Sequence, residues 1–165
     1  QFFPVEVFSK LGYEVSISGQ KSYNGVAIIS KIESSEFKKG FENNSTNRDI
    51  IKTFEEQKRL ISLVTNGIKI INVYVPNGSS IDSEKFKYKI KWLDQLRLYL
   101  DEEEKKGIPI CLLGDFNIAP NNKDIHDPQK YQGGIMASEI EREALNNLLK
   151  DKLIDSFIII FINLI

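Results

Sequence analysis

A carboxylate and a carboxamide lie two residues apart at the end of an apolar segment of this chain. Residues 108–113 are short and apolar, which is typical of a buried strand, and Gly114, Asp115 and Asn117 follow them. The carboxyl ends of strands form the ligand-binding edge of open α/β sheets, so this strand would bring both polar groups to a site. The alternative is an ordinary turn that ends a strand, because Asp and Asn both favour turns.

Tyr74 is the second candidate, because it also ends a predicted strand just before a loop. Its phenol could donate a hydrogen bond to a phosphate oxygen, whereas an aromatic residue at the end of a strand usually packs at the margin of the sheet. The shared position of Tyr74 and Asp115 favours the functional interpretation. Arg59 begins a strand, and its planar guanidinium suits a phosphate, although a charge exposed on the surface is its ordinary interpretation.

Other chemistries do not fit the spacing of the residues. A calcium loop that begins at Asp115 would need Gly and Glu where Pro120 and His126 stand, so that interpretation fails. His126 is the only histidine and lies between Asp and Pro in a loop, so we do not assign it as a general base. Cys111 is the only cysteine, which excludes a disulfide and a thiolate zinc site, and we expect it to be a small buried apolar residue.

The composition is that of one ordinary globular domain. The chain has 165 residues, 41% of them hydrophobic and 27% charged, and a formal net charge of −1 at pH 7. This charge gives no global attraction to nucleic acid, so binding to DNA would depend on local patches. The lysines at 85, 87, 89 and 91 wrap around a predicted helix, and we expect them to be solvated.

Hydrophobic spacing and turn residues predict the elements that position these groups. We expect strands at 14–18, 26–29, 59–64, 68–75 and 108–113, and a loop at 38–47. Asn66 and Gly67 predict a hairpin between the third and fourth strands. Asp82 or Ser83 would cap a long helix, whose buried stripe comprises Phe86, Ile90, Leu93, Leu96 and Leu100. Ser138 and Glu141 form the capping box of a second helix, and the whole order predicts sheets covered by helices.

Taken together, these residues resemble the exodeoxyribonuclease III family of the endonuclease/exonuclease/phosphatase superfamily. The Gly114–Asn117 motif is shared across that superfamily, whereas the 74–78 loop at its proper distance before it is more specific. The matching stretches occur in family order and cover about residues 1–157; they are 12–13, 19–28, 56–61, 71–78, 113–120, 141–145 and 153–157.

The resemblance implies a fold and a domain organisation. The fold class would be α/β, the central part of a four-layer α/β sandwich with two facing mixed sheets flanked by helices, incomplete at both termini. Residues 1–157 would form a partial domain, and 158–165 would be an apolar tail of uncertain origin. This tail is shorter than the roughly 20 apolar residues that cross a bilayer, so we expect no membrane partner.

The resemblance also implies a Mg²⁺-dependent phosphodiesterase, with Mn²⁺ as an alternative ion, that acts in base excision repair. It would cut double-stranded DNA at abasic sites and remove nucleotides from 3′ ends. Asp115 would orient the attacking water, Asn117 would assist at the phosphate, and both are candidate metal ligands. Tyr74 would contact the scissile phosphate. The residues that would bind DNA are Arg59, Gln20, Lys21, Tyr23, Asn24, Gly25 and Asn77.

The chain departs from the family pattern at both ends. The principal metal-binding Glu of the family would lie just before Gln1, and its terminal Ser-Asp-His would follow the last residue. The pattern stops near Phe157, where Ile158 stands in place of the usual Arg. We therefore expect a fragment that is inactive by itself, because catalytic groups that act together lose most of the rate when one is removed.

Two other functions remain open from the sequence. A phosphatase of the same superfamily that acts on lipid or inositol phosphates would share the Gly114–Asn117 motif but not the loops at 20–25 and 74–78. A non-catalytic DNA-binding module would bind DNA in a salt-dependent way without cutting it. We expect the complete protein to be monomeric and cytoplasmic.

Overall fold

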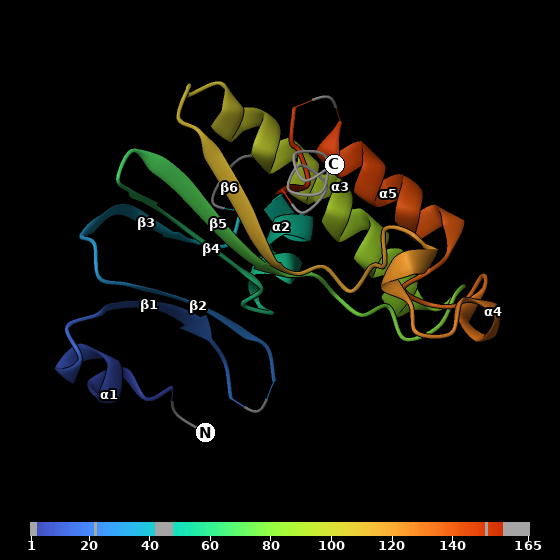
Figure 1. Cartoon of the computed structure of the whole chain (residues 1–165), viewed down its shortest axis with the longest axis horizontal. Coiled ribbons are helices and arrows are strands. Elements are labelled where there is room, and N and C mark those ends of the chain that lie inside the picture. The colour runs from blue at the N-terminus through green and yellow to red at the C-terminus, as the bar shows by residue number, and fades with distance from the viewer. Residues whose placement is uncertain (1–2, 22, 42–47, 151, 157–165) are drawn as a thin grey trace, which may run out of the picture. The chain divides into compact units, whose positions relative to one another are not determined.

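The computed structural model of the chain describes residues 3–21, 23–41, 48–150 and 152–156 (Figure 1). The chain divides into two compact units, which we describe separately. The first comprises Gln1–Val75 and Leu98–Phe116, and the second comprises Pro76–Arg97 and Asn117–Ile165. The predicted tail at 158–165 lies outside the described residues. Within the described ranges, no helix combines the length and apolar character that spanning a membrane would require.

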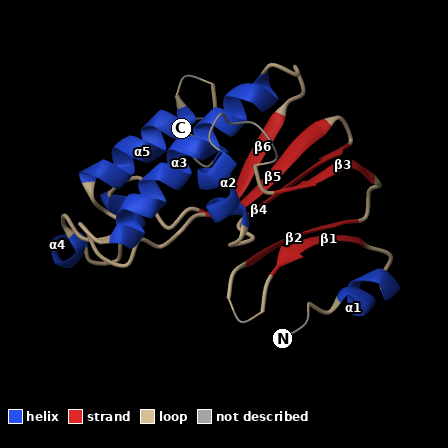
Figure 2. Cartoon of the chain, turned by 180° about the vertical axis from the view of Figure 1, so that it is seen from behind, coloured by secondary structure: helices blue, strands red, loops and turns tan. Residues whose placement is uncertain are grey.

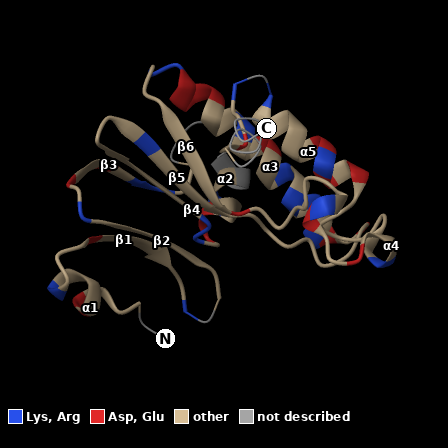
Figure 3. Cartoon of the chain, in the orientation of Figure 1, with Lys and Arg blue, Asp and Glu red and all other residues tan. Residues whose placement is uncertain are grey.

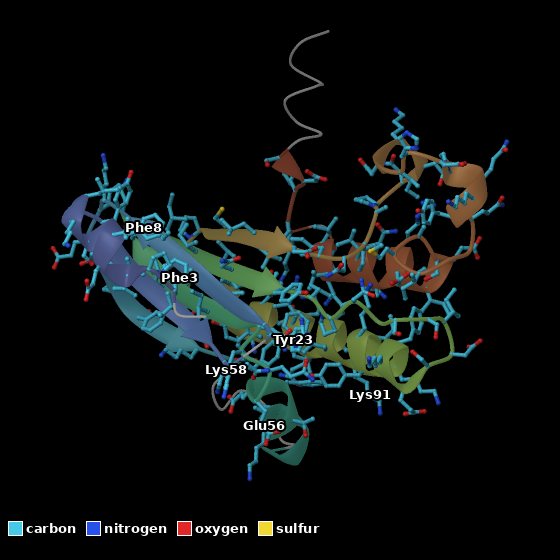
Figure 4. The ribbon with its side chains drawn as sticks, turned by 90° about the horizontal axis from the view of Figure 1, so that it is seen from below. Phe3, Phe8, Tyr23, Glu56, Lys58 and Lys91 are labelled. Atoms are coloured by element: carbon cyan, nitrogen blue, oxygen red, sulfur yellow. The ribbon has the colours of Figure 1, made fainter. Side chains whose placement is uncertain are left out.

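The first unit begins with a helix and a small antiparallel sheet. Helix α1 (Val5–Lys10) contacts β1 (Glu14–Gly19), which pairs with β2 (Gly25–Ser30) in an antiparallel register from Glu14↔Ser30 to Gly19↔Gly25. Phe3 stacks on Phe8 of this helix, with ring centroids 5.6 Å apart (Figure 4). Because β1 and β2 are antiparallel and consecutive in the chain, they form a hairpin.

A four-stranded sheet forms the centre of the first unit. Its strands, β3 (Ser34–Lys39), β4 (Leu60–Thr65), β5 (Ile68–Tyr74) and β6 (Ile110–Asp115), lie in that order. The pairs β3–β4 and β4–β5 are antiparallel, whereas β5–β6 is parallel. The predicted hairpin at Asn66 and Gly67 is confirmed, and both residues have the positive φ that a tight two-residue turn needs.

The two sheets of this unit face each other, and helices cover both outer faces (Figures 1 and 2). Strand β2 contacts β4 and β5, and Asn72 Nδ2 donates a hydrogen bond to the carbonyl of Ala27 at 2.8 Å. On the other face, α2 (Arg48–Glu55) and residues 98–104 of α3 (Glu84–Glu104) pack through aromatic residues. Phe41 makes edge contacts with Phe54 and Tyr99. The predicted α/β class, with two facing sheets flanked by helices, is confirmed.

The second unit contains the first part of α3 together with η1 (Asn122–Asp124), α4 (Pro128–Tyr131) and α5 (Glu139–Leu149). Ser83 caps α3, because its hydroxyl accepts a hydrogen bond from Phe86 N at 3.1 Å. In the first turn, the hydrogen bond from Lys87 lowers the pKa of the Glu84 carboxyl below its ordinary value. The predicted capping box at the start of α5 is also confirmed.

Three expectations about individual segments are wrong. Cys111 is exposed and β6 is largely open to solvent, because among the described residues β6 pairs only with β5 and lies at the edge of the sheet. Lys89 is fully buried instead of solvated, and Ile90 of the predicted stripe is only half-buried. The predicted loop at 38–47 is wrong at its first two residues, which end β3, a strand that pairs with β4 although it has few apolar residues. Residues 42–47 of this loop lie outside the described residues.

Candidate active site

The register of the two parallel strands brings two of the predicted catalytic residues together. Strands β5 and β6 end at the same edge of the sheet, where Tyr74 is paired with Asp115. The next residue continues the pairing, since Val75 N donates to the carbonyl of Asp115 at 2.8 Å. Asp115 is exposed and Tyr74 is half-buried. Asp115 is also the only charged residue of β6, and Figure 3 shows that the rest of this strand carries no Lys, Arg, Asp or Glu.

Gly114 allows β6 to approach β5 closely enough for this pairing. Its φ is +133°, and a Cβ placed there would lie 1.9 Å from the carbonyl oxygen of Val73 and 2.9 Å from Asn72 Oδ1. The backbone oxygen cannot move away without displacing β5. The glycine before Asp115 is therefore required by the sheet itself.

Arg59 is held against Tyr74 by several contacts. Its guanidinium lies 4.7 Å from the centre of the Tyr74 ring, and its Nη1 donates to the Tyr74 carbonyl at 3.1 Å. In the other direction, Tyr74 N donates to the Arg59 carbonyl at 2.8 Å, and Gln57 Oε1 accepts from Arg59 Nε at 2.7 Å. The cation therefore stacks on the phenol ring, an arrangement that the sequence reasoning missed because it placed the two residues on separate strands without their register.

The predicted DNA-binding loop forms the tip of the β1–β2 hairpin. Gln20, Lys21 and Tyr23 are exposed, and the side chain of Tyr23 has 79% of its surface accessible (Figure 4). Asn24 has a φ of 60°, and Gly25 leads back into β2. Ser22 lies outside the described residues. The loop thus presents an aromatic ring and a cation to solvent, which suits stacking on a base and contact with a phosphate.

In the second unit, Asn77 and Asn117 contact each other. Asn77 Nδ2 donates to Asn117 Oδ1 at 3.3 Å, and Asn77 Oδ1 accepts from Ser79 N at 3.2 Å. Asn117 has a φ of 51°, in the left-handed region that non-glycine residues seldom adopt. This strained backbone occurs at a predicted catalytic residue. His126, which we did not assign to the site, is exposed in the loop after η1.

The donor atoms of these residues match the preference of Mg²⁺ or Mn²⁺ for oxygen. Asp115 offers a carboxylate and Asn117 a carboxamide oxygen, and Mg²⁺ usually needs only one or two carboxylates besides water and substrate phosphate. Among the described residues, no three His, Cys, Asp or Glu side chains gather in a group that could hold a metal ion. Asp115 in the first unit and Asn117 in the second are therefore each an oxygen donor of the kind that Mg²⁺ or Mn²⁺ prefers.

A profile of the endonuclease/exonuclease/phosphatase family matches residues 3–153. The chain belongs to this family. Exodeoxyribonuclease III of Haemophilus influenzae is 38% identical to it over 126 residues, which cover 74% of this chain and 45% of that protein. The family and the resemblance to exodeoxyribonuclease III are thereby confirmed.

Solved structures of the same family share the fold. An AP endonuclease from Archaeoglobus fulgidus has a TM-score of 0.79 and 36% identity, over 90% of this chain and 54% of its own. A 3′ phosphatase from Neisseria, solved with a product DNA hairpin, has a TM-score of 0.78 and 36% identity, over 89% of this chain and 54% of its own. The chain spans about half the length of the relatives it matches.

Proposed function

We propose that the chain forms part of a metal-dependent DNA phosphodiesterase of the exodeoxyribonuclease III type. Its substrates would be double-stranded DNA with abasic sites and DNA with 3′ ends, in base excision repair. The observation that supports this most directly is the register that pairs Tyr74 with Asp115 at the carboxyl edge of the sheet. The names of the family members above support the same substrate class. We also propose that the complete protein is monomeric and cytoplasmic.

Each predicted residue has a role in this proposal that its chemistry allows. The Asp115 carboxylate accepts a hydrogen bond from the attacking water and orients it toward phosphorus. The Tyr74 phenol donates to a phosphate oxygen, and Arg59, stacked on Tyr74, adds positive charge beside it. Asn117 donates from its NH₂ group, since its Oδ1 accepts from Asn77. Asp115 and Asn117 are candidate ligands for Mg²⁺, or Mn²⁺ as an alternative, which would neutralise phosphate charge when bound.

The remaining predicted residues would position the DNA. The exposed hairpin loop, with Gln20, Lys21, Tyr23, Asn24 and Gly25, would contact the strand beside the lesion. Such contacts fix the register of the protein on the duplex without reading its sequence. Asn77 would act at the phosphate through its hydrogen bond to Asn117.

The test is cleavage of a duplex that carries one synthetic abasic site, with Mg²⁺, with Mn²⁺ and with EDTA. The 165-residue chain is compared with the lengthened chain, by which we mean the same residues extended at both ends by the flanking coding sequence. We expect the lengthened chain to cut the duplex with metal and not with EDTA, and the 165 residues alone not to cut. If neither chain cuts, the nuclease proposal fails, and salt-dependent binding without cleavage would then favour a DNA-binding module.

A DNA 3′-phosphatase is the second candidate function, because a protein described by that activity shares the fold at 36% identity. The two activities differ in the bond that is broken. A duplex that ends in a 3′-phosphate would release inorganic phosphate if the lengthened chain is a phosphatase, while an abasic duplex would remain intact. Release of phosphate from an inositol phosphate, without action on DNA, would favour a phosphatase that acts on lipid or inositol phosphates.

Replacing Tyr23 by Ala is expected to weaken DNA binding by the lengthened chain. Stacking of a base on an aromatic side chain contributes about 1–3 kcal/mol, so Kd should rise roughly 5- to 150-fold. Fluorescence anisotropy with the abasic duplex in EDTA measures this change. Tyr131→Ala is the matched control, because Tyr131 is also exposed, at 44%, but lies on α4 outside the predicted loop. Equal effects of the two substitutions would contradict the role of Tyr23.

A further inference from the structure

Lys89 and Glu141 form a fully buried ion pair in the second unit. Lys89 Nζ donates to Glu141 Oε1, and both side chains have 0% of their surface exposed. Removing two charges from water costs several kcal/mol each, and replacing such a pair by apolar residues often leaves stability unchanged or raised. A contribution to stability is therefore a weak explanation for this ion pair. Its other contacts show which residues it holds in place.

The ammonium of Lys89 makes a second hydrogen bond, to the backbone of a predicted catalytic residue. Lys89 Nζ donates to the carbonyl oxygen of Asn117 at 2.7 Å. The backbone of Asn117 has a φ of 51°, so its conformation needs support from its surroundings. The Lys89 ammonium provides that support to the backbone of Asn117, whose carboxamide oxygen accepts a hydrogen bond from Asn77.

The aliphatic stem of Lys89 lies near Gly78, in the loop that carries Asn77. A Cβ on Gly78 would lie 3.2 Å from Lys89 Cδ, so the aliphatic stem occupies the space beside the residue that follows Asn77. The carbonyl of Gly78 also accepts from Ser83 Oγ at 2.8 Å. One side chain thus supports both loops whose asparagines contact each other.

The capping box of α5 fixes the carboxylate at the other end of this chain of contacts. Glu141 Oε2 accepts from Ser138 Oγ at 2.7 Å and from Ser138 N at 3.2 Å, while Oε1 accepts from Lys89. Both carboxylate oxygens of Glu141 therefore accept hydrogen bonds. Arg142, the next residue, donates from Nε to the carbonyl of Ala119 at 3.2 Å, which ties the same loop to α5 a second time.

We infer that Lys89 and Glu141 are positioning residues that act through Asn117. The start of α5 holds Glu141, Glu141 holds the ammonium of Lys89, and Lys89 fixes the strained backbone of Asn117 so that its carboxamide is aligned by Asn77. Their effect on the reaction rests on the proposed function, whereas their effect on the geometry of Asn117 does not. Neither residue would touch the DNA.

The first experiment measures the geometry in the 165-residue chain and needs no activity. Lys89→Met combined with Glu141→Gln removes both charges at nearly constant volume and leaves an acceptor for Ser138. We expect the backbone and carboxamide NMR signals of Asn117 to shift or broaden in this variant, while circular dichroism and the other signals of α3 and α5 persist. Lys91→Met is the matched control, because Lys91 is exposed on the same helix (Figure 4), and it should leave the Asn117 signals unchanged.

The second experiment is a double-mutant cycle on abasic-site cleavage by the lengthened chain. We expect the paired substitution to lower kcat by about 10- to 100-fold with little change in KM, but to cause no further loss when Asn117 is already Ala. A purely structural role would lower the rate by the same factor in both backgrounds, since independent effects add. Lys89→Arg, which keeps a charged donor, should retain most of the rate.

The two experiments separate this inference from the proposed function. Unchanged Asn117 signals in the paired variant would overturn the inference, whether or not the lengthened chain cuts DNA. Cleavage by the wild-type lengthened chain together with additive losses in the cycle would also overturn it and leave the proposed function intact. Should the wild-type lengthened chain fail to cut, the NMR result alone decides whether Lys89 and Glu141 fix Asn117.

Discussion

Asp115→Asn is expected to lower the rate of abasic-site cleavage by the lengthened chain about 10³-fold. The substitution keeps the size of the side chain and its place at the end of β6, but replaces the carboxylate with a group that accepts a proton far more weakly. Positioned general bases contribute typically 10²–10⁴-fold, which sets the size of the expected loss. Because Asp115 is exposed, the substitution should leave the melting temperature of the protein nearly unchanged.

A matched control separates the role of this carboxylate from a general effect of charge. Asp94 is an exposed carboxylate on α3, and Asp94→Asn changes the net charge by the same amount. Single-turnover cleavage of the abasic duplex should therefore proceed at the wild-type rate in the Asp94 variant. If the two variants cut at the same rate, Asp115 does not act in the reaction and the proposed site is wrong.

The sequence predicted those structural features of the candidate site that local patterns determine. Strand ends at Tyr74 and Asp115 follow from short apolar runs that stop at turn residues, and the parallel pairing of β5 with β6 then brings the two residues together. The hairpin at Asn66 and the capping box at Ser138 are likewise local, because each depends on residues no more than a few positions apart.

The parts that the sequence did not predict depend on distant partners. The sequence predicts Lys89 to be solvated on its helix, whereas its hydrogen bonds to Glu141 and to the Asn117 carbonyl, both remote in sequence, explain its burial. Strand β3 has few apolar residues and forms by pairing with β4. Cys111 lies in an apolar run, yet it is exposed, because in the part of the chain that the structure describes β6 pairs only with β5. Burial depends on which neighbours are present, and periodicity does not specify them.

The stacking of Arg59 on Tyr74 changes how the predicted phosphate contacts are understood. From the sequence, each residue was a separate candidate for a phosphate. The structure joins them through a cation–π contact and two backbone hydrogen bonds, so substitution of either one would disturb the other. Effects of substitutions at such neighbouring positions are not expected to add.

Gly114→Ala is expected to cause the largest loss of stability of any single substitution proposed for this chain. The added Cβ would lie 1.9 Å from the Val73 carbonyl oxygen, and a φ of +133° is itself unfavourable for alanine. Overpacking costs typically 1–3 kcal/mol and a backbone conformation restricted to glycine costs a similar amount, so the free energy of unfolding should fall by about 2–6 kcal/mol. Urea denaturation of the 165-residue chain, followed by circular dichroism, measures this change.

Gly107→Ala is the matched control for this loss of stability. Gly107 also has a positive φ, of +72°, but apart from its neighbours in the chain no atom of the described residues lies within 4 Å of an added Cβ, so only the backbone cost of about 1–2 kcal/mol applies. The difference between the two variants in the free energy of unfolding therefore measures the cost of the collision between the added Cβ and β5, which would push the ends of the two strands apart. Because that collision occurs between the residues paired beside Tyr74 and Asp115, a variant that still folds should also lose cleavage in the lengthened chain. Equal losses of stability in both variants would show that β6 does not approach β5 as closely as the register requires.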